Sequence, residues 1–371
     1  KMYDTYGFPV DVTKNILLEN NFSLDLKKYQ KILDENKSKQ KKTWTGKTSD
    51  TIFLKSKLQK DCSPTIFVGH DESICESSLI CIIRENKIIK STSLDSSGIY
   101  LVFDKTPFYA ESGGQIGDSG TILTDKRSLV CKIKDTQKIE GDFFLHLVEA
   151  SKNGQKLEVG NKYLLSIDKL KRNKIRNNHS ATHLLHESLR KVLGEHVTQK
   201  GSLVNEEKLR FDFSYNKPIG ESKIQEIEKL VNESIRSNVK RDEKFLPVKK
   251  AIENGAIALF GEKYPEKVRV ISFINKNDKK KVSSIELCGG THVLSTGQIG
   301  SFKILSDSSI SSGVRRIEAL TGEEADNYFY KKKKFVNEIN QLLKSSDENI
   351  LEKIQNLKNE IFELKKNLKK I

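Results

Sequence analysis

The sequence predicts an α+β protein of several domains: a short helical segment, a small β-barrel, a two-layer α+β domain and a C-terminal coiled-coil helix. Two observations lead to this prediction. Short β-branched and aromatic runs separated by turn residues fill the middle of the chain, and amphipathic helices alternate with strands after them. With 371 residues, the chain is long enough for two or three domains that each bury a core.

The N-terminal part of the chain divides into a helical segment and a strand-rich segment. Residues 1–50 are predicted to be helical after the turn at Gly7-Phe8-Pro9. Residues 51–165 are predicted to form the small β-barrel, because short strands recur there between turn signals. The expected strands are 65–68, 79–83, 99–103 and 143–147.

Residues 166–330 are predicted to form the α+β domain, in which helices pack on a mostly antiparallel sheet. A basic run over 169–176 leads into a helix from about Ser180 to Leu193, which Gly194 ends. The other elements expected there are a strand at 210–213, an amphipathic helix over 224–235, and strands around 268–271 and 299–304.

Residues 331–371 are predicted to be helical and to form the coiled-coil segment. Apolar residues repeat there with the spacing 4-3-4-3-4-3, which is an a/d seam over three heptads. The seam either pairs with another helix, which would allow self-association, or packs on the protein's own surface. Its members are Ile350, Ile354, Leu357, Ile361, Leu364, Leu368 and Ile371.

The composition excludes a membrane-spanning protein and leaves the partner open. No apolar run approaches the ~20 residues needed to cross a bilayer, and the N-terminus lacks a signal-type stretch, so we expect a cytoplasmic protein. The net charge of +15 suits a polyanionic partner, or it reflects a Lys-rich surface. The five cysteines are dispersed and odd in number, so they do not form a disulfide framework.

Two short motifs combine into a candidate metal site. His179 and His183 stand four residues apart on the expected helix, so both imidazoles leave the same face. Cys288 and His292 add a thiolate and a third imidazole, a ligand set that favours zinc. Four protein ligands would close a structural site, whereas a catalytic zinc keeps one position for water or substrate, and the sequence leaves both open. His186 is either a spare ligand or a structural histidine.

Seven segments together resemble the alanyl-tRNA synthetase family over nearly the whole chain. Threonyl-tRNA synthetases and free-standing Ala-tRNA editing proteins share the two metal motifs, whereas the YDTYGFPVD start is similar to the end of the tRNA-recognition region of the alanyl enzymes. In family order the segments are 3–11 (YDTYGFPVD), 106–117 (TPFYAESGGQIG), 179–185 (HSATHLL), 199–203 (QKGSL), 260–264 (FGEKY), 287–292 (LCGGTH) and 313–318 (GVRRIE).

The resemblance implies that residues 166–330 are an editing domain that hydrolyses Ser-tRNA(Ala) and Gly-tRNA(Ala). Such editing is needed because a pocket for alanine cannot exclude the smaller glycine and rejects an added hydroxyl poorly. Thr182 would help to tell serine from alanine, and Gln199 would orient water or the ester. The residues that match the family's zinc ligands are His179, His183, Cys288 and His292, and those that match its editing pocket are Thr182, Gln199 and Ser202.

The resemblance also implies contacts with the acceptor end of tRNA(Ala). Asp4 matches a family residue that helps to read a wobble G·U pair, since a carboxylate can accept a hydrogen bond from the exocyclic amino group of guanine. The basic run offers Lys171, Arg172, Lys174 and Arg176 for phosphate contact, or else it forms a solvated face.

No segment resembles the domain of this family that binds ATP and alanine, so ATP and magnesium are expected only in an aminoacylation domain that would precede residue 1. We therefore predict a portion of an alanyl-tRNA synthetase that edits with one zinc ion. The alternatives are a non-catalytic tRNA-binding module with a structural zinc, and a free-standing trans-editing deacylase.

Overall fold

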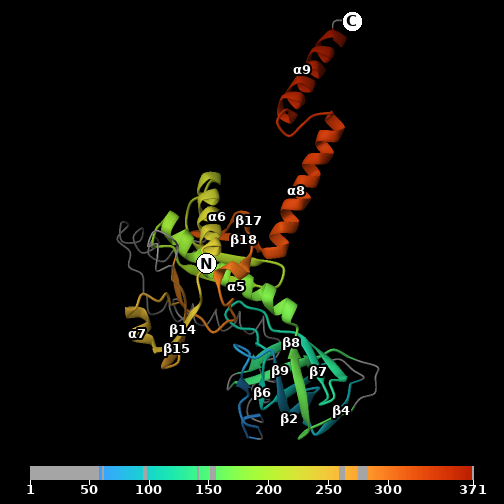
Figure 1. The fold of residues 1–371 in the computed structure, drawn as a ribbon, viewed down its shortest axis with the longest axis vertical. Coiled ribbons are helices and arrows are strands. Elements are labelled where there is room, and N and C mark those ends of the chain that lie inside the picture. The colour runs from blue at the N-terminus through green and yellow to red at the C-terminus, as the bar shows by residue number, and fades with distance from the viewer. Residues whose placement is uncertain are drawn as a thin grey trace, which may run out of the picture.

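The protein is described here from a computed structural model, which covers residues 58–60, 62–94, 98–139, 142–150, 156–258, 264–274 and 283–369. The expectations for residues 1–50, Asp4 among them, lie outside these ranges. Figure 1 shows a strand-rich part at the bottom, a layer of helices and strands in the middle and a helical arm at the top. The predicted α+β fold with a small β-barrel is confirmed.

Six antiparallel strands close into the barrel. Their order is β11-β7-β8-β9-β5-β2, and the pairing of β11 with β2 completes the ring. β3 continues β2 as a hairpin, while β1 pairs with β6 and β4 pairs with β10. The bounds are β1 Ile66–Phe67, β2 Ile74–Arg84, β3 Lys87–Ile89, β4 Ser91–Ser93, β5 Ile99–Phe103, β6 Lys105–Thr106, β7 Gly120–Leu123, β8 Leu129–Ile139, β9 Phe143–Val148, β10 Lys156–Glu158 and β11 Lys162–Ile167.

A buried histidine lies in the apolar core of the barrel. The ring of His146 on β9 packs edge-on against Phe103 and Phe108, with ring centroids 5.3 Å apart in both cases. Its Nδ1 lies 2.9 Å from the carbonyl oxygen of Leu101, and its Nε2 lies 2.7 Å from the hydroxyl of Thr106. Since a carbonyl only accepts, Nδ1 carries the proton and the threonine hydroxyl donates to Nε2.

The middle layer contains a four-stranded antiparallel sheet of order β12-β13-β18-β17 and a three-stranded antiparallel sheet of order β14-β15-β16. Apolar residues of α5 and α6 share one core with β13, β17 and β18, so the helices cover the larger sheet. The bounds are α5 Lys169–Leu193, β12 Gln199–Val204, β13 Leu209–Ser214, α6 Glu221–Arg236, β14 Asp242–Pro247, α7 Val248–Glu253, β15 Lys267–Phe273, β16 Ser284–Leu287, η1 Thr296–Ile299, β17 Phe302–Ser311 and β18 Val314–Thr321.

Helix α5 begins at Lys169, well before the expected start near Ser180. Asp168 is the reason, because its carboxylate accepts the backbone N–H of Lys171 at 3.0 Å and caps the helix. The basic run is therefore the first two turns of the helix rather than a lead-in to it. The boundary expected at residue 165 falls inside β11.

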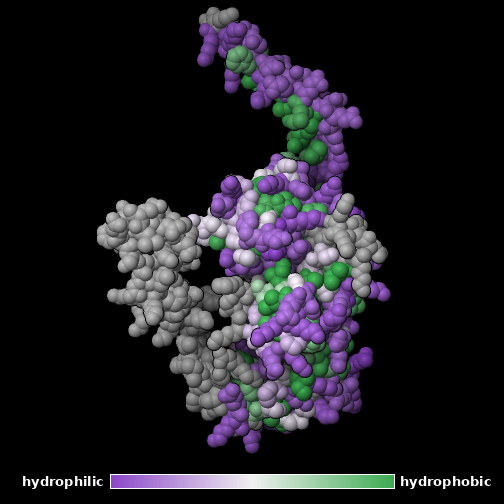
Figure 2. Space-filling model, turned by 90° about the vertical axis from the view of Figure 1, so that its left-hand side faces the viewer, coloured by the Kyte–Doolittle hydropathy of each residue, from purple (hydrophilic) through white to green (hydrophobic). Residues whose placement is uncertain are grey.

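The arm consists of α8, Gly322–Leu343, and α9, Ile350–Leu368. Helix α8 starts directly after β18, so the boundary expected at residue 330 lies inside it. The described members of the predicted seam all lie on α9, none of whose residues is buried, and Figure 2 shows apolar side chains at the surface of the arm. Self-association through this helix stays a prediction. Within the described ranges, no helix is both long and apolar enough to cross a membrane.

Candidate metal centre

The four predicted metal ligands converge. One ligand atom from each of His179, His183, Cys288 and His292 lies within 4.8 Å of the others. The Sγ of Cys288 is 3.4 Å from Nε2 of His179 and 3.2 Å from Nε2 of His292. Zinc bonds of about 2.0–2.3 Å in a tetrahedron separate neighbouring ligand atoms by roughly 3.3–3.7 Å. The spacing therefore fits a single ion.

Two backbone segments present these ligands. Helix α5 presents the histidine pair from one face, and Cys288 follows directly after β16 on a short loop. Arg269 on β15 holds this loop, because its guanidinium donates to the carbonyls of Cys288 at 3.1 Å and Gly290 at 2.7 Å. A Cβ at Gly290 would lie 2.0 Å from Cε1 of His179, so the loop can approach the helix this closely only with glycine there.

The three imidazoles are in the neutral form that metal binding requires. Burial holds the pKa of His179 and of His292 well below the ordinary value, and the charges of neighbouring histidines act in the same direction. Burial also lowers the pKa of His183. Within the described part of the chain, Nδ1 of His183 is buried without a hydrogen-bond partner. An unpaired buried nitrogen among neutral imidazoles and a thiol suits a zinc ion.

Two side chains that the sequence did not single out orient the ligand rings. The hydroxyl of Ser180 lies 3.1 Å from Nδ1 of His292. The buried carboxylate of Glu286 lies 3.4 Å from Nε2 of His183 and accepts a hydrogen bond from Nδ1 of His186 at 3.1 Å. His186 is thereby placed beside the ligand group and outside the four-residue cluster.

A cavity of about 280 Å³ opens beside the cluster. Thr182 from α5 and Gln199 and Ser202 from β12 line it together with three of the four ligands, so the structure brings the expected pocket residues to one place. The Thr182 hydroxyl donates to the carbonyl of Asn178 at 2.8 Å, and the Gln199 amide donates to the Ser202 hydroxyl at 3.2 Å. The barrel part of the chain also contributes lining residues, which are Tyr109, Ser112 and Gly113.

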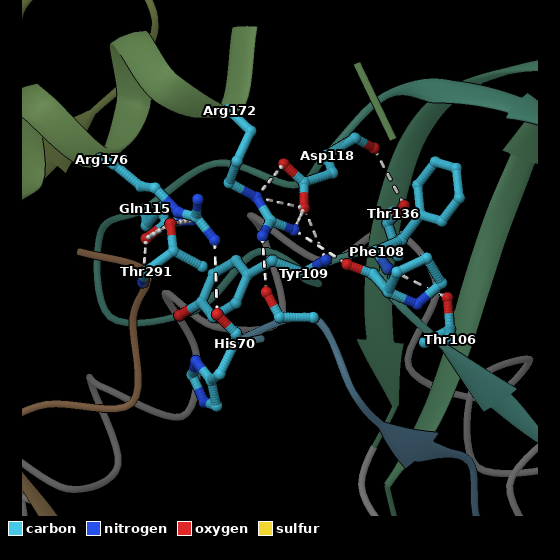
Figure 3. A network of polar contacts seen from close by, with 12 residues as sticks. His70, Thr106, Phe108, Tyr109, Gln115, Asp118, Thr136, Arg172, Arg176 and Thr291 are labelled. Atoms are coloured by element: carbon cyan, nitrogen blue, oxygen red, sulfur yellow. Dashed lines mark hydrogen bonds and ion pairs between the residues drawn. The ribbon is translucent and has the colours of Figure 1, made fainter. Parts of the chain in front are cut away.

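The expectation that Arg172 contacts phosphate is corrected by its burial. Only 1% of its surface is exposed, and Figure 3 shows its guanidinium directed at the carboxylate of Asp118. It forms an ion pair with Asp118 and donates to the carbonyls of Gly69 at 2.7 Å and Pro107 at 2.9 Å. Arg172 therefore fastens α5 to the barrel, and its burial keeps it from contact with a nucleic acid.

The three other residues expected to contact phosphate, Lys171, Lys174 and Arg176, keep some exposed surface but have protein partners. Lys171 lies 3.4 Å from the carboxylate of Glu206, and Lys174 lies 2.8 Å from that of Glu323. Arg176 donates to the carbonyl of His70 at 3.4 Å, and burial lowers its pKa to about 10. Phosphate contact by these three residues stays a proposal.

Comparisons with known proteins support the resemblance. The family described as class II (A) tRNA synthetases matches residues 1–171, and the second additional domain of threonyl and alanyl tRNA synthetases matches residues 268–318. Relatives named alanine--tRNA ligase, from Mesorhizobium japonicum and Sinorhizobium medicae, are each 39% identical over 374 residues. These alignments cover 99% of this chain and 41% of each relative, so the chain spans less than half of their length.

Proposed function

Because this chain is related over 99% of its length to part of the alanine--tRNA ligases, we propose that it carries their editing reaction, the zinc-dependent hydrolysis of Ser-tRNA(Ala) and Gly-tRNA(Ala). The observation that supports this most is the shared cavity. His179, His183 and Cys288 line the same cavity as Thr182 and Gln199. A metal centre that forms the wall of a cavity can act on a molecule inside it, whereas a metal buried on all sides only stabilises the fold.

The reaction is hydrolysis of the ester that joins an amino acid to the terminal ribose of a tRNA. Water adds to the ester carbonyl, the bond to the ribose oxygen breaks, and that oxygen takes up a proton. A zinc ion held by the four residues would polarise the carbonyl or the water. The carbonyl oxygen of the Gln199 amide is suited to orient the water, because it can accept one of its hydrogens.

Discrimination between serine and alanine is assigned to Thr182. Its hydroxyl donates to a backbone carbonyl of its own helix, so its oxygen remains an acceptor toward the cavity. A serine side chain can donate to that oxygen, and alanine cannot. A site built around one such hydrogen bond rejects the analogue that lacks it far better than a purely apolar pocket does.

For the whole protein we propose attachment of alanine to tRNA(Ala) with ATP and magnesium. This activity would use parts of the relatives that this chain does not cover. The partner of the chain itself would be the acceptor end of tRNA(Ala). Lys267 lies at the cavity and is exposed, and this cation supports the proposed approach of the terminal phosphates to the cavity.

One observation favours a second candidate, a tRNA-binding module whose zinc is structural. Four protein ligands already complete a tetrahedron, and a complete tetrahedron has no position for water. Deacylation of Ser-tRNA(Ala) by the full chain, measured before and after zinc removal by a chelator, separates the two. Circular dichroism reports whether the metal-free chain stays folded.

Zinc-dependent editing is supported if removal of zinc stops deacylation by a chain that stays folded, and if added zinc restores the deacylation. Undiminished deacylation by a folded, metal-free chain contradicts the role of zinc. Unfolding on removal, with no deacylation by the loaded chain, favours the binding module. The third alternative, a free-standing trans-editing deacylase, is tested by reading the gene upstream of the codon for Lys1 for an aminoacylation domain.

A further inference from the structure

We propose that Gln115, which lies between β6 and β7 of the barrel, is a positioning residue for the metal centre. It would set the tautomer of His179 and hold the cysteine-containing loop against α5. This inference rests on the proposed role of His179 as a ligand. Gln115 is 0% exposed, and its side chain contacts residues 64 and 176 positions away in the sequence.

The hydrogen bonds of Gln115 identify which of its two amide atoms is the oxygen and which is the nitrogen. The backbone N–H of Thr291 points at one amide atom of Gln115 at 2.8 Å, and since an N–H only donates, that atom is the oxygen. The same oxygen lies 2.8 Å from Nδ1 of His179. Nδ1 must therefore carry the proton. Nε2 of His179 is left with its lone pair, 3.4 Å from the Sγ of Cys288.

The Gln115 amide also joins the two segments that supply the ligands. Its oxygen binds α5 through His179, and its Nε2 donates to the hydroxyl of Thr291 at 3.0 Å, next to the ligand His292. Figure 3 shows Gln115 between Arg176 of α5 and Thr291. A single side chain from the barrel thus bridges helix and loop, in addition to the direct hydrogen bond between Ser180 of α5 and His292 of the loop.

The backbone around Gln115 is held in place as well. The N–H of Ile116 donates to the carbonyl of Val204 at 3.1 Å, and the N–H of Val204 donates to the carbonyl of Gly114 at 2.7 Å. A Cβ at Gly114 would lie 2.3 Å from the Ser202 hydroxyl, so glycine is needed for this approach to β12. The amide is therefore presented from a fixed backbone, as an orienting partner must be.

Removing the amide oxygen would leave two buried N–H groups without an acceptor and would free the His179 ring to rotate. Outer partners of ligand histidines typically change metal affinity 10–100-fold when they are lost. We expect Gln115→Leu, which keeps the volume and removes both polar atoms, to weaken zinc binding by about this factor. Gln115→Glu keeps an acceptor for both N–H groups and should stay within a few-fold of the wild type.

The test measures metal affinity of the full chain without tRNA, by competition of Zn²⁺ with a chromophoric chelator. A second readout is the absorption spectrum of bound Co²⁺, whose bands report ligand geometry. Gln137→Leu is the control, because Gln137 is a half-buried glutamine of barrel strand β8 whose amide donates to Glu111 and Asp135 and not to the metal centre. Gln115→Asn keeps a polar side chain but is one methylene too short to reach Nδ1.

The proposal is supported if Gln115→Leu and Gln115→Asn lose affinity and alter the Co²⁺ bands while Gln115→Glu and Gln137→Leu do not. It is overturned if Gln115→Leu and Gln115→Asn bind zinc like the wild type. It is also overturned if Gln137→Leu loses affinity equally, since the effect would then be general destabilisation. If Gln115→Leu does not fold, the zinc affinity of Gln115→Asn decides whether the proposal holds. The experiment uses no tRNA. The role of Gln115 in zinc binding is therefore tested even if the chain turns out not to hydrolyse Ser-tRNA(Ala).

Discussion

Arg172 on α5 donates from its Nε to both carboxylate oxygens of Asp118 at 2.9 Å, and the two side chains are 1% and 2% exposed. Asp118 in turn accepts the backbone N–H of Tyr109 at 2.7 Å, and Tyr109 lines the cavity. The ion pair thus connects the helix that carries His179 with a barrel loop that also lines the cavity. It stabilises the relative position of the two halves of the site.

We expect Arg172→Ala to lower the free energy of unfolding by about 3–5 kcal/mol, because it leaves the buried carboxylate of Asp118 without its counter-charge. Urea unfolding followed by circular dichroism measures this loss. Lys138→Ala is the control, since Lys138 pairs with Asp142 on the surface and should cost less than about 1 kcal/mol. Unchanged stability of Arg172→Ala together with weaker tRNA binding would restore Arg172 to the nucleic-acid surface.

The sequence could predict the parts of the site that depend on local spacing. His179 and His183 share a helix face by periodicity, and Cys288 and His292 lie on one loop. That the two pairs meet depends on the packing of β16 beside α5, across more than 100 residues. The ligand chemistry of the two pairs suggested one zinc site, and the family resemblance supported it.

The roles of Arg172 and Gln115 could not be predicted, because they depend on contacts between domains, which leave no local pattern in the sequence. Arg172 lies in a run that is basic throughout, and only the docking of α5 on the barrel separates it from its exposed neighbours. Gln115 follows two glycines, Gly113 and Gly114, which have φ of +58° and +83°. Its partners His179 and Thr291 are distant in sequence, so spacing could not reveal them.

Acid is expected to destabilise the barrel through His146. Burial lowers the pKa of His146 from 6.5 to about 4, although its hydrogen bond to Leu101 opposes the change. Between pH 6.5 and pH 4 the unfolded chain therefore binds a proton that the folded chain does not, and stability falls as pH falls through this window. The full loss from this one group is about 3 kcal/mol.

The contribution of His146 is separated from those of other acid-titrating groups by comparison with His146→Gln. At pH 7 the variant should be less stable, because it replaces an imidazole fitted to Leu101 and Thr106. The deficit should shrink steadily between pH 6.5 and pH 4, since the variant has no group to protonate there. Parallel stability curves for the two proteins, measured by urea unfolding at each pH, would exclude His146 as the source of acid sensitivity.

Cys288→Ala is expected to abolish deacylation of Ser-tRNA(Ala) while tRNA binding stays within a few-fold of the wild type. The thiol lies 3.2–3.4 Å from two imidazoles of the cluster, so its loss removes a quarter of the proposed ligand set. The proposed phosphate contacts elsewhere would supply most of the affinity and would be unaffected. Single-turnover hydrolysis and a filter-binding titration provide the two measurements. Cys131→Ala, a buried cysteine of the barrel, serves as the comparison. If Cys288→Ala loses tRNA binding as strongly as hydrolysis, the metal centre serves to stabilise the fold rather than to catalyse hydrolysis.

Lys267→Ala is expected to weaken tRNA binding and to reduce its salt dependence without affecting stability. Lys267 is exposed on β15 at the cavity, so on the proposed path of the tRNA its loss would remove one phosphate contact and the counterion released with it. The slope of log affinity against log salt should decrease in magnitude by about 0.7 for a single-stranded end. Filter binding at several salt concentrations measures this slope.

Lys162→Ala is the control, because Lys162 is exposed on the barrel, where it pairs with Glu76. If the two variants have the same slope as the wild type, the acceptor end does not pass Lys267, and the path of the tRNA must be assigned to another side of the cavity.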